Sequence, residues 1–534
     1  MRVVNTAEMK EMEKTALEEY GLEESLIIEN IGIRGANRLH EQFLSKKSFG
    51  EIVLLIGKGN NGADGLAIGR HLREFGYRVR AFMLFDESES SKEVGRQAKM
   101  AFGMGVKINA VRSAGQIEAY FQENQGEYFV VDAIFGTGIR LPLSNFIHDV
   151  IKTTNRHASL CVALDIPTGI TGDAGMSKGV AVRADFTLAV GVPKVGYYSA
   201  NGARHSGEVI ILSAGFPKHM IRKGSKNLIG LEFMSKVLGK RNKFAHKNSF
   251  GHTLVLGGSP GQVGAVVLAA NGALKVGSGL VTVATWEDSY GELNMKLNPE
   301  IMSRVIPKDE SKWGFLSGYL DNFDTLVVGP GLGQRKESKT LLRKVLMDFM
   351  GPVVLDADAI HCLSDEEGKR LLKGRKQPVI ITPHLGEFAA FTQKTVSAVE
   401  AAPVDSLREI VDEVNSYVIL KGPGTYIGFP TGEIFINYMP NAGMATGGSG
   451  DVLAGMIGGL LAQAVTKNQF FNPNYMSNEW DASVTLGVFV HSLAGFHAAE
   501  RTGVRAMTAW SIINHIQYAF SDIGRSKQEI RPKG

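Results

Sequence analysis

The chain has 534 residues, of which 44% are hydrophobic and 21% are charged, with a formal net charge of +4 and two cysteines. These values are near globular averages, so they exclude a largely disordered chain, and the length favours two domains. They give no indication of nucleic-acid binding or of a disulfide framework. No run of about 18 apolar residues predicts a membrane span. We therefore expect a cytoplasmic protein that binds neither nucleic acid nor a membrane.

The N-terminal part begins with two predicted helices and continues as alternating strands and helices. Thr6 is a candidate N-cap, and Tyr20-Gly21 ends the first helix. Short apolar runs between helical segments are typical of a buried parallel sheet, which indicates a doubly wound, Rossmann-like α/β domain. Helices are expected at 6–19, 24–43, 64–75, 90–104, 113–122 and 146–155, and strands at 51–56, 78–84, 128–133, 159–164 and 186–190.

Three loops of this part follow predicted strands and are rich in glycine and oxygen-bearing side chains. Gly57-Lys-Gly-Asn-Asn-Gly62 matches the dinucleotide pattern G-x-G-x-x-G, and Asp86 ends the next strand. This pattern alone fits an ordinary Rossmann oxidoreductase. The loops after 128–133 and 159–164 should converge on the same crevice, because the carboxyl ends of parallel strands share one edge. The crevice would suit a cation beside a phosphate, whereas helix and turn capping is the alternative role of its residues, Asn60, Asn61, Asp64, Asp132, Asp165 and Thr168.

The same loops, Asn60-Asn-Gly-Ala-Asp64, Asp132-Ala-Ile-Phe-Gly-Thr-Gly138 and Asp165-Ile-Pro-Thr-Gly169, resemble the YjeF N-terminal family over roughly residues 1–225. Members of that family epimerise hydrated NAD(P)H, called NAD(P)HX. Ala63 stands where the family usually has glycine, and Thr168 where it often has serine. The resemblance implies that a potassium ion is held by Asn61, Asp132 and Thr168. It implies substrate contacts from Asn60, Asn61, Gly62, Ala63, Asp64, Gly136, Thr137, Gly138, Ile139, Arg140, Leu141, Pro142 and Asp165. For the epimerisation itself, Asp165 is our candidate acid/base for reversible ring opening or loss of the hydroxyl.

A connection between two domains is expected at 216–250, because the basic stretch 236–247 interrupts the apolar periodicity. A surface loop within one large domain is the alternative. We place the domains at 1–225 and 226–534. The second part is again α/β and starts with the apolar run 252–258. Its further strands are expected at 280–284, 325–328, 353–355, 379–382, 417–421 and 425–429, and its helices at 263–276, 338–349, 385–391, 404–414, 451–463 and 482–501.

The most informative motif of the second part is Asn441-Ala-Gly-Met-Ala-Thr-Gly-Gly-Ser-Gly-Asp451, a glycine-rich loop that runs into an apolar helix. A helix start offers unpaired amides to a phosphate, and glycine lets that phosphate approach closely. A carboxylate at this place is unfavourable unless it does chemistry or binds a metal, so Asp451 is predicted to be the base of a phosphoryl transfer to a hydroxyl. No G-x-x-x-x-G-K-S/T motif occurs, which excludes a Walker-type nucleotidase.

Other loops that follow predicted strands complete this pattern, at 257–265, 329–333, 356–360, 382–387 and 421–425. Taken singly, His384 could be a hydrogen-bonded loop histidine and 421–425 a plain β-turn. Together the set resembles the ribokinase-like NAD(P)HX dehydratases over roughly 240–520, with Asn298 at a position where that family usually has histidine. The resemblance implies substrate contacts from Ala265, Gly331, His384 and Asp451. It implies adenine-nucleotide contacts from Lys421, Gly422, Pro423, Gly424, Thr425, Asn441, Ala442, Gly443, Met444, Ala445, Thr446, Gly447, Gly448, Ser449 and Gly450.

Both resemblances together imply a bifunctional repair enzyme for hydrated NADH and NADPH. The first domain would epimerise (R)- and (S)-NAD(P)HX, and the second would dehydrate the (S) form with ADP, or ATP, as phosphoryl donor and Mg²⁺ on its phosphates. Phosphorylation would turn the ring hydroxyl into a good leaving group. A homo-oligomer is expected. Two alternatives remain: a ribokinase-like small-molecule kinase with an N-terminal nucleotide-binding domain, and a non-enzymatic interaction module, against which the intact set of oxygen ligands argues.

Overall fold

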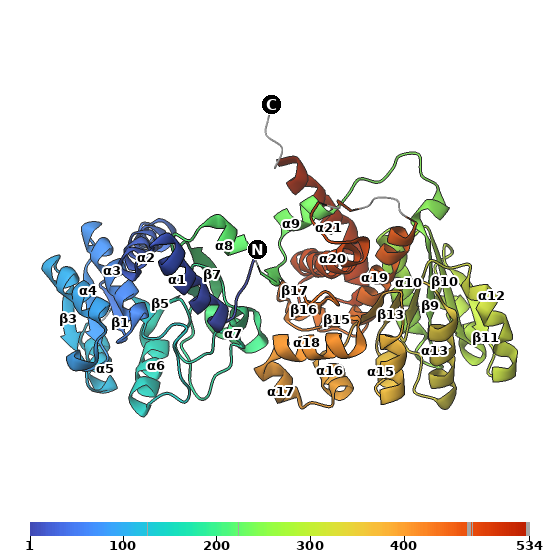
Figure 1. The fold of residues 1–534 in the computed structure, drawn as a ribbon, viewed down its shortest axis with the longest axis horizontal. Coiled ribbons are helices and arrows are strands. Elements are labelled where there is room, and N and C mark those ends of the chain that lie inside the picture. The colour runs from blue at the N-terminus through green and yellow to red at the C-terminus, as the bar shows by residue number, and fades with distance from the viewer. Residues whose placement is uncertain (125, 223, 467–470, 473, 530–534) are drawn as a thin grey trace. The chain divides into compact units, whose positions relative to one another are not determined.

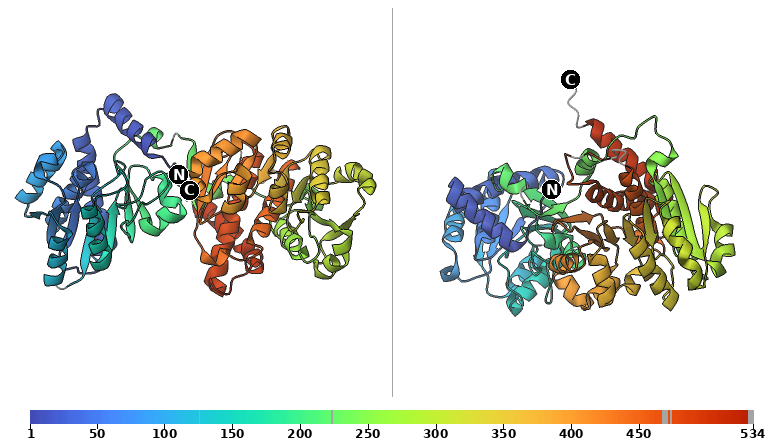
Figure 2. Two further views of the ribbon diagram at one scale, coloured as in Figure 1. Left: turned by 90° about the horizontal axis from the view of Figure 1, so that it is seen from below. Right: turned by 45° about the vertical axis from the view of Figure 1, so that its right-hand side comes forward.

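Two compact units, Met1–Lys226 and Asn227–Gly534, divide the chain (Figure 1). The computed structural model describes residues 1–124, 126–222, 224–466, 471–472 and 474–529. Each unit contains one sheet with helices packed against it, as further views of the ribbon show (Figure 2). The expectation of an α/β chain is confirmed for both units.

The sheet of the first unit has seven strands in the order β3-β2-β1-β4-β5-β6-β7, all parallel. The chain reverses its direction of travel across the sheet between β1 and β4, which is the switch point of a doubly wound fold. The strands are β1 (Ile52–Ile56), β2 (Val79–Met83), β3 (Lys107–Ala110), β4 (Tyr128–Ala133), β5 (Ala158–Leu164), β6 (Phe186–Val190) and β7 (Glu208–Leu212). The helices are α1 (Thr6–Tyr20), α2 (Glu24–Leu39), α3 (Asn60–Glu74), α4 (Lys92–Gly103), α5 (Ala114–Glu123), α6 (Asn145–His157), α7 (Ala200–Ser206) and α8 (Lys218–Arg222).

Two apolar cores cover the two faces of this sheet. Leu54 of β1 packs with residues of α1 to α4, whereas its neighbours Val53 and Leu55 pack with residues of α5 and α6. This alternation explains why β1 is apolar along its whole length. The predicted helix 24–43 ends at Leu39 and continues as a π-helical turn, His40–Leu44. Strand β3 was not predicted, because an edge strand that is largely exposed carries little apolar signal.

The sheet of the second unit has ten strands in the order β11-β10-β9-β12-β13-β14-β15-β16-β17-β8, parallel from β11 to β15 and antiparallel from β15 to β17. Its strands are β8 (Lys226–Leu228), β9 (His252–Leu256), β10 (Leu280–Trp286), β11 (Met302–Ile306), β12 (Thr325–Val328), β13 (Val353–Leu355), β14 (Val379–Ile381), β15 (Tyr417–Leu420), β16 (Gly424–Gly428) and β17 (Ile434–Tyr438).

Helices cover both faces of this sheet, with α10, α19, α20 and α21 on one face and α13, α15, α16 and α18 on the other (Figure 1). They are α9 (Leu231–Val237), α10 (Val263–Lys275), α11 (Tyr290–Lys296), α12 (Leu316–Leu320), α13 (Lys336–Asp348), α14 (Asp358–Cys362), α15 (Glu366–Lys373), α16 (Leu385–Thr392), α17 (Val396–Ala401), α18 (Pro403–Val414), α19 (Ser449–Val465), α20 (Glu479–Thr502) and α21 (Ala509–Glu529).

The segment predicted to connect two domains contains regular structure. Strand β8 extends the second sheet, and Met234 and Val237 of α9 belong to the apolar core that α21 completes. The basic residues around α9 therefore hide its apolar pattern in the sequence, although the helix packs into the core. One helix of the described chain, α20, is long and apolar enough to cross a membrane by length and composition, but 78% of its apolar window is buried in the core of the second unit.

Candidate active sites

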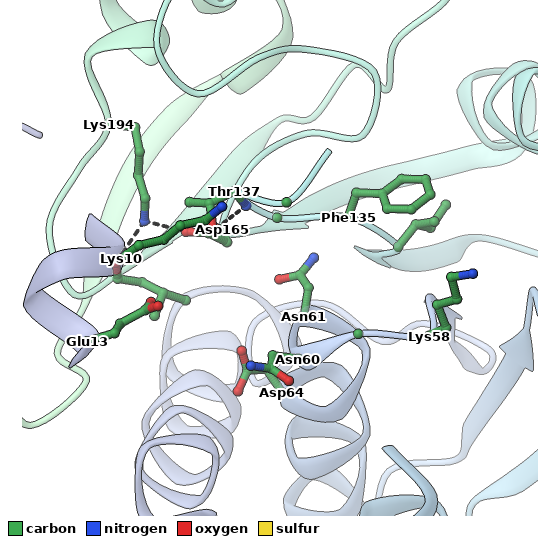
Figure 3. A pocket seen from close by; sticks show the side chains of 15 residues that line it. Lys10, Glu13, Lys58, Asn60, Asn61, Asp64, Phe135, Thr137, Asp165 and Lys194 are labelled. Carbon is green, nitrogen blue, oxygen red and sulfur yellow. Dashed lines mark hydrogen bonds and ion pairs between the residues drawn. The ribbon is translucent and has the colours of Figure 1, made fainter. Parts of the chain in front are cut away.

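A cavity of about 390 Å³ lies at the carboxyl ends of the strands of the first unit, where the switch point predicts a ligand (Figure 3). The loops after β1, β4, β5 and β6 and the helix α1 form its walls. Its lining residues are Lys10, Glu13, Lys58, Gly59, Asn60, Asn61, Asp64, Ile134, Phe135, Gly136, Thr137, Gly138, Asp165, Val190 and Lys194. The structure thus brings together the predicted residues Asn60, Asn61, Asp64, Gly136, Thr137, Gly138 and Asp165.

The polar centre of this cavity is an ion pair between Asp165 and Lys194, whose Nζ lies 2.5 Å from Asp165 Oδ1. The Lys194 side chain is 1% exposed, and it also donates to the carbonyl of Val190 at 3.0 Å. The backbone N–H of Thr137 donates to Asp165 Oδ2 at 3.2 Å. Two hydrogen-bond partners thus orient the carboxylate toward the cavity.

Sequence reasoning missed Lys194, although a signal was present. The residue follows β6 within the segment Gly191-Val-Pro-Lys194, so it stands at the same sheet edge as Asp165. Lysine is seldom fully buried without a partner. Because its burial becomes apparent only when α1 closes over the strand ends, the sequence pattern alone could not single it out.

Two further carboxyl groups, Asp64 and Glu13, face the cavity with raised pKa values. Burial, and then the charges of Asp165 and Glu13, raise the pKa of Asp64 well above its usual range. Its Oδ1 is buried without a hydrogen-bond partner in the described structure. Desolvation, and then the charge of Asp165, raise the pKa of Glu13. Two carboxyl groups whose pKa values are raised by burial therefore lie with Asp165 around one buried ammonium.

Glycine is required where the loops approach one another. A Cβ at Gly62 would lie 1.9 Å from the carbonyl oxygen of Gly57, and one at Gly136 would lie 2.7 Å from Asp165 Oδ2. Ala63 differs from them, because it is fully buried in the apolar core of the unit. The predicted substrate residues that are not among the lining residues of this cavity are Gly62, Ala63, Ile139, Arg140, Leu141 and Pro142.

Asp132 and Thr168, two of the predicted cation ligands, lie buried beside the cavity. Thr168 donates to Asp132 through both its hydroxyl and its backbone N–H, each at 2.7 Å, and Ile134 N–H donates at 3.2 Å. Burial raises the pKa of Asp132 to about 6. Asn61 lines the cavity and donates its amide to the carbonyl of Leu164 at 3.1 Å, which leaves its oxygen directed elsewhere.

In the second unit, Asp451 lies in the first turn of α19 beside Lys421. Lys421 Nζ pairs with Asp356 Oδ1 at 2.9 Å, and Thr382 Oγ1 donates to the same oxygen at 2.7 Å. A Cβ at Gly450 would lie 3.1 Å from Lys421 Nζ. The ends of β13, β14 and β15 thus meet the start of α19, where the helix dipole favours an anion.

The pKa of Asp451 is raised to about 7, first by burial and then by the charges of Asp356 and Glu387, while Lys421 acts in the opposite direction. Burial alone would lower the pKa of Lys421, but Asp356, Glu387 and Asp451 raise it, so the ammonium stays charged. A carboxyl with a pKa near neutral is suited to accept a proton during catalysis. The sequence placed Asp356 in the loop 356–360 after a predicted strand but assigned it no role of its own.

His384 forms an isolated β-bridge with Lys421, whereas Ala265 lies in the first turn of α10 and Gly331 in the loop after β12. Nδ1 of His384 accepts the N–H groups of Gly386 and Glu387 at the start of α16, and its side chain is 61% exposed. These contacts fit the alternative of a hydrogen-bonded loop histidine, and Nε2 lies 3.5 Å from Glu387 Oε1. Gly331 has φ +57°, and a Cβ there would lie 3.4 Å from Ala265 Cβ, so these two residues are neighbours.

The predicted nucleotide loop leads directly into α19. Asn441 Oδ1 accepts from Gly443 N–H at 2.9 Å, and its amide donates to the carbonyl of Gly495 at 2.9 Å. Gly448, at the N-cap position, has φ 89°, which favours glycine. The helix begins at Ser449 rather than at the predicted 451. The loop 421–425 joins β15 to β16, and Thr425 Oγ1 donates to the carbonyl of Gly422 at 3.2 Å.

Comparison with known proteins accounts for both halves. Residues 24–196 match the family model described as YjeF-related protein N-terminus, and residues 253–518 match the model described as NAD(P)H-hydrate dehydratase. The chain is 31% identical to the bifunctional NAD(P)H-hydrate repair enzyme of Moorella thermoacetica, over 100% of this chain and 99% of that protein. It is 32% identical to the enzyme of the same description from Thermofilum pendens, over 97% and 96%.

A similar solved structure is the ADP/ATP-dependent NAD(P)H-hydrate dehydratase from Bacillus subtilis, co-crystallised with ATP and Mg²⁺. It is 25% identical, covers 56% of this chain and 98% of that chain, and has a TM-score of 0.46. The two sheets and their sites define an α/β enzyme with two sites of the kind that bind nucleotides, one at the switch point of a doubly wound sheet and one at the start of α19. The chain belongs to the family of bifunctional NAD(P)H-hydrate repair enzymes. The family, fold and activity predicted from the sequence are thereby confirmed.

Proposed function

We propose that the first domain, 1–225, interconverts (R)- and (S)-NAD(P)HX at Asp165, and that the second, 226–534, dehydrates (S)-NAD(P)HX at Asp451. The observation that carries the assignment is Asp451 itself, a half-buried carboxyl with a pKa near neutral at a helix start beside a lysine. This constellation supports phosphoryl transfer to a hydroxyl. Substrates are NADHX, NADPHX and ADP, with ATP as the alternative donor.

In the dehydration step, Asp451 accepts the proton of the ring hydroxyl while the oxygen of that hydroxyl attacks the terminal phosphorus of the donor. Lys421 and the first-turn amides of α19, with Gly448, Ser449 and Gly450, stabilise the phosphoryl oxygens. The ring nitrogen then expels phosphate, and loss of a proton from the neighbouring ring carbon restores the double bond. Each amide donor of this kind typically contributes about 3–4 kcal/mol to lowering the barrier.

Mg²⁺ would supply charge neutralisation on the donor phosphates. No group of three or more His, Cys, Asp or Glu side chains in the described chain could hold a metal by itself. This fits an ion that is bound through substrate phosphates and at most one or two carboxylates, as Mg²⁺ usually is. Asp356 and Asp358, which follow β13, are the carboxylates placed to contribute.

In the epimerisation step, Asp165 takes the proton of the ring hydroxyl, the C–O bond becomes a carbonyl and the bond from that carbon to the ring nitrogen breaks. The proton returns to the oxygen when the nitrogen closes the ring on the other face. In the alternative route, protonated Asp165 donates to the hydroxyl, which leaves as water, and water adds back from the other face. Lys194 keeps Asp165 oriented and donates a proton to the leaving atom. Two groups of opposite charge 2.5 Å apart in a buried cavity support this division of roles.

Potassium is proposed beside this site. Asn61, Asp132 and Thr168 all offer oxygen, the ligand that hard cations prefer. Asp132 accepts three hydrogen bonds, fewer than the roughly four that a carboxylate can accept, so one lone pair is left for a cation. Epimerisation that is faster in potassium than in lithium salts is the expected result, and equal rates would contradict the assignment.

The test of the whole proposal follows NADH absorbance after both epimers of NADHX are mixed with protein and ADP or ATP. We expect complete, nucleotide-dependent recovery. Asp451→Asn should abolish recovery while epimer exchange persists, and Asp165→Asn should leave about one epimer's share rapidly recoverable. The control is Asp405→Asn, an exposed carboxylate in the first turn of α18. A stable phosphorylated sugar or vitamin product would favour the kinase alternative instead.

A further inference from the structure

A second cavity of about 340 Å³ adjoins the first along the same sheet edge and has no role in the steps above. It lies over the ends of β1, β2 and β3, and it shares Lys58, Ile134 and Phe135 with the first cavity. Lys58 and Phe135 stand on the side of the first cavity away from Lys194 (Figure 3). Among the residues that line only the second cavity are Phe85, Asp86 and Arg112.

The position of the two cavities matches the two halves of a dinucleotide. In doubly wound sheets a dinucleotide lies across the switch point, with its pyrophosphate at the start of the helix after the first strand. Here the switch point lies between β1 and β4, and α3 begins at Asn60, between the cavities. With Asp165 and Lys194 on the hydrated ring, the adenosine half is directed over β1 and β2, into the second cavity.

The second cavity presents both side chains that dinucleotide-binding proteins use to recognise the adenine ribose. A carboxylate near the end of the second strand hydrogen-bonds a free 2′-hydroxyl, and a nearby arginine accommodates a 2′-phosphate. Asp86 follows β2 and Arg112 follows β3, and they form an ion pair, Arg112 Nη2 to Asp86 Oδ1, of 2.7 Å. Arg112 Nη1 donates to the carbonyl of Phe85 at 2.9 Å, which holds the guanidinium in place.

This ion pair is easily exchanged. The side chains of Arg112 and Asp86 are 52% and 60% exposed, and an exposed pair of this kind contributes little to stability. A phosphate is a better bidentate partner for a guanidinium than a single carboxylate oxygen. Asp86 can turn into solvent when a 2′-phosphate arrives, and can stay when the ribose carries only hydroxyls.

We propose that the second cavity binds the adenine ribose of the epimerase substrate, and that Arg112 exchanges Asp86 for the 2′-phosphate when that substrate is NADPHX. One site then accepts both hydrated nucleotides through alternative partners of a single arginine. This inference rests on the proposed epimerase function of the first unit, and it adds the residues that distinguish the two substrates.

The test measures epimer exchange of NADHX and of NADPHX separately, with the full chain and no ADP or ATP present. Arg112→Gln should raise KM for NADPHX about tenfold or more, the loss expected for a charge-assisted hydrogen bond, and should leave KM for NADHX unchanged. Asp86→Asn should raise KM for NADHX and leave KM for NADPHX equal or lower. Arg96→Gln is the control, because Arg96 is an exposed arginine of α4 that pairs with Glu93 of the same helix.

A second measurement keeps the test independent of catalysis. Adenosine 2′-monophosphate should bind the full chain in calorimetry with an affinity that falls about tenfold in Arg112→Gln and not in Arg96→Gln. The inference is overturned if the wild type epimerises both substrates and the ratio of KM for NADPHX to KM for NADHX is unchanged in Arg112→Gln and in Asp86→Asn. It is also overturned if adenosine 2′-monophosphate binds Arg112→Gln as tightly as the wild type. Absence of epimerisation in the wild type overturns the proposed function instead, and the binding measurement still decides on the cavity.

Discussion

Asp165 combines an unusual backbone with a buried partner. Its φ of 62° lies in the left-handed region, which aspartate and asparagine enter more readily than most residues. Gly136 leaves room for its carboxylate, and Lys194 balances the charge. Strain of this kind persists where the surroundings hold it and is common at active sites. Asp165→Asn is therefore a substitution that the backbone tolerates, so a change in activity reports on the carboxylate.

Lys194→Met is predicted to slow epimerisation by about 10²-fold or more, the usual contribution of one general acid or base, and to leave dehydration unchanged. It should also lower the free energy of unfolding of the first unit by about 3–5 kcal/mol, because it leaves a buried carboxylate without its partner. Adding Asp165→Asn should restore stability but not activity. The rate of epimer exchange measures the first effect and denaturant titration the second. A double variant that regains activity would contradict the catalytic role of the Asp165–Lys194 pair.

The pH dependence of dehydration follows from Asp451. Because the pKa of this carboxyl is raised to about 7 and the base acts in its charged form, kcat/KM should increase as pH rises through about 7. Lys421 lowers the pKa of Asp451, so Lys421→Gln should move the inflection to higher pH in addition to reducing the rate. Rate measurements from pH 5 to pH 9, roughly two units on either side, decide this, and an inflection that moves down would refute the assigned coupling.

At the scale of elements, close packing of α10 against α19 positions the start of α19. A Cβ at Gly455 would lie 1.8 Å from the carbonyl oxygen of Ala269, and one at Gly459 would lie 2.6 Å from that of Ala273. These glycines let the two helix backbones approach each other, and the approach places Gly448 to Asp451 beside Lys421. Gly455 and Gly459 of α19 thus serve helix packing, whereas the glycines that precede the helix belong to the predicted nucleotide loop.

Gly455→Ala is predicted to lower the free energy of unfolding of the second unit by about 1–3 kcal/mol or more, because the methyl overlaps a backbone oxygen that cannot turn aside. The matched control is Gly524→Ala in α21, where a Cβ meets nothing within 4 Å. It should stabilise by about 0.5–1 kcal/mol through helix propensity. Thermal unfolding monitored by circular dichroism compares the two variants, with dehydration assays below the transition. Equal changes in stability for Gly455→Ala and Gly524→Ala would exclude the packing argument.

At the scale of the whole molecule, each activity is expected to reside in one compact unit with its own sheet and core. Mixing Asp165→Asn protein with Asp451→Asn protein should therefore restore recovery of both NADHX epimers, because the hydrated nucleotide diffuses between molecules. NADH absorbance with ADP measures this. If the mixture of the two variants recovers only about one epimer's share of NADH, both activities must be present in the same chain.

Local sequence determined a large part of this protein. Apolar runs such as those within 51–56 and 353–355 predicted buried parallel strands, because burial on both faces leaves no polar alternation. Glycine loops beside Asp165 and Asp451 predicted two sites at strand ends and a helix start. These features are local, since a few neighbouring residues are sufficient to define a strand end or a helix start.

Only the tertiary structure decided which distant side chains share a site. Lys194 meets Asp165 across 29 positions and Lys421 meets Asp356 across 65, and neither pairing has a local pattern. The same holds for β3, which is a strand because β2 offers it an edge, and for Arg112, which reaches Asp86 from the neighbouring strand. The sequence alone therefore determined the two folds and the chemistry class of each site. Burial and charge pairing, which depend on contacts between remote segments, determined which residues carry the reactions.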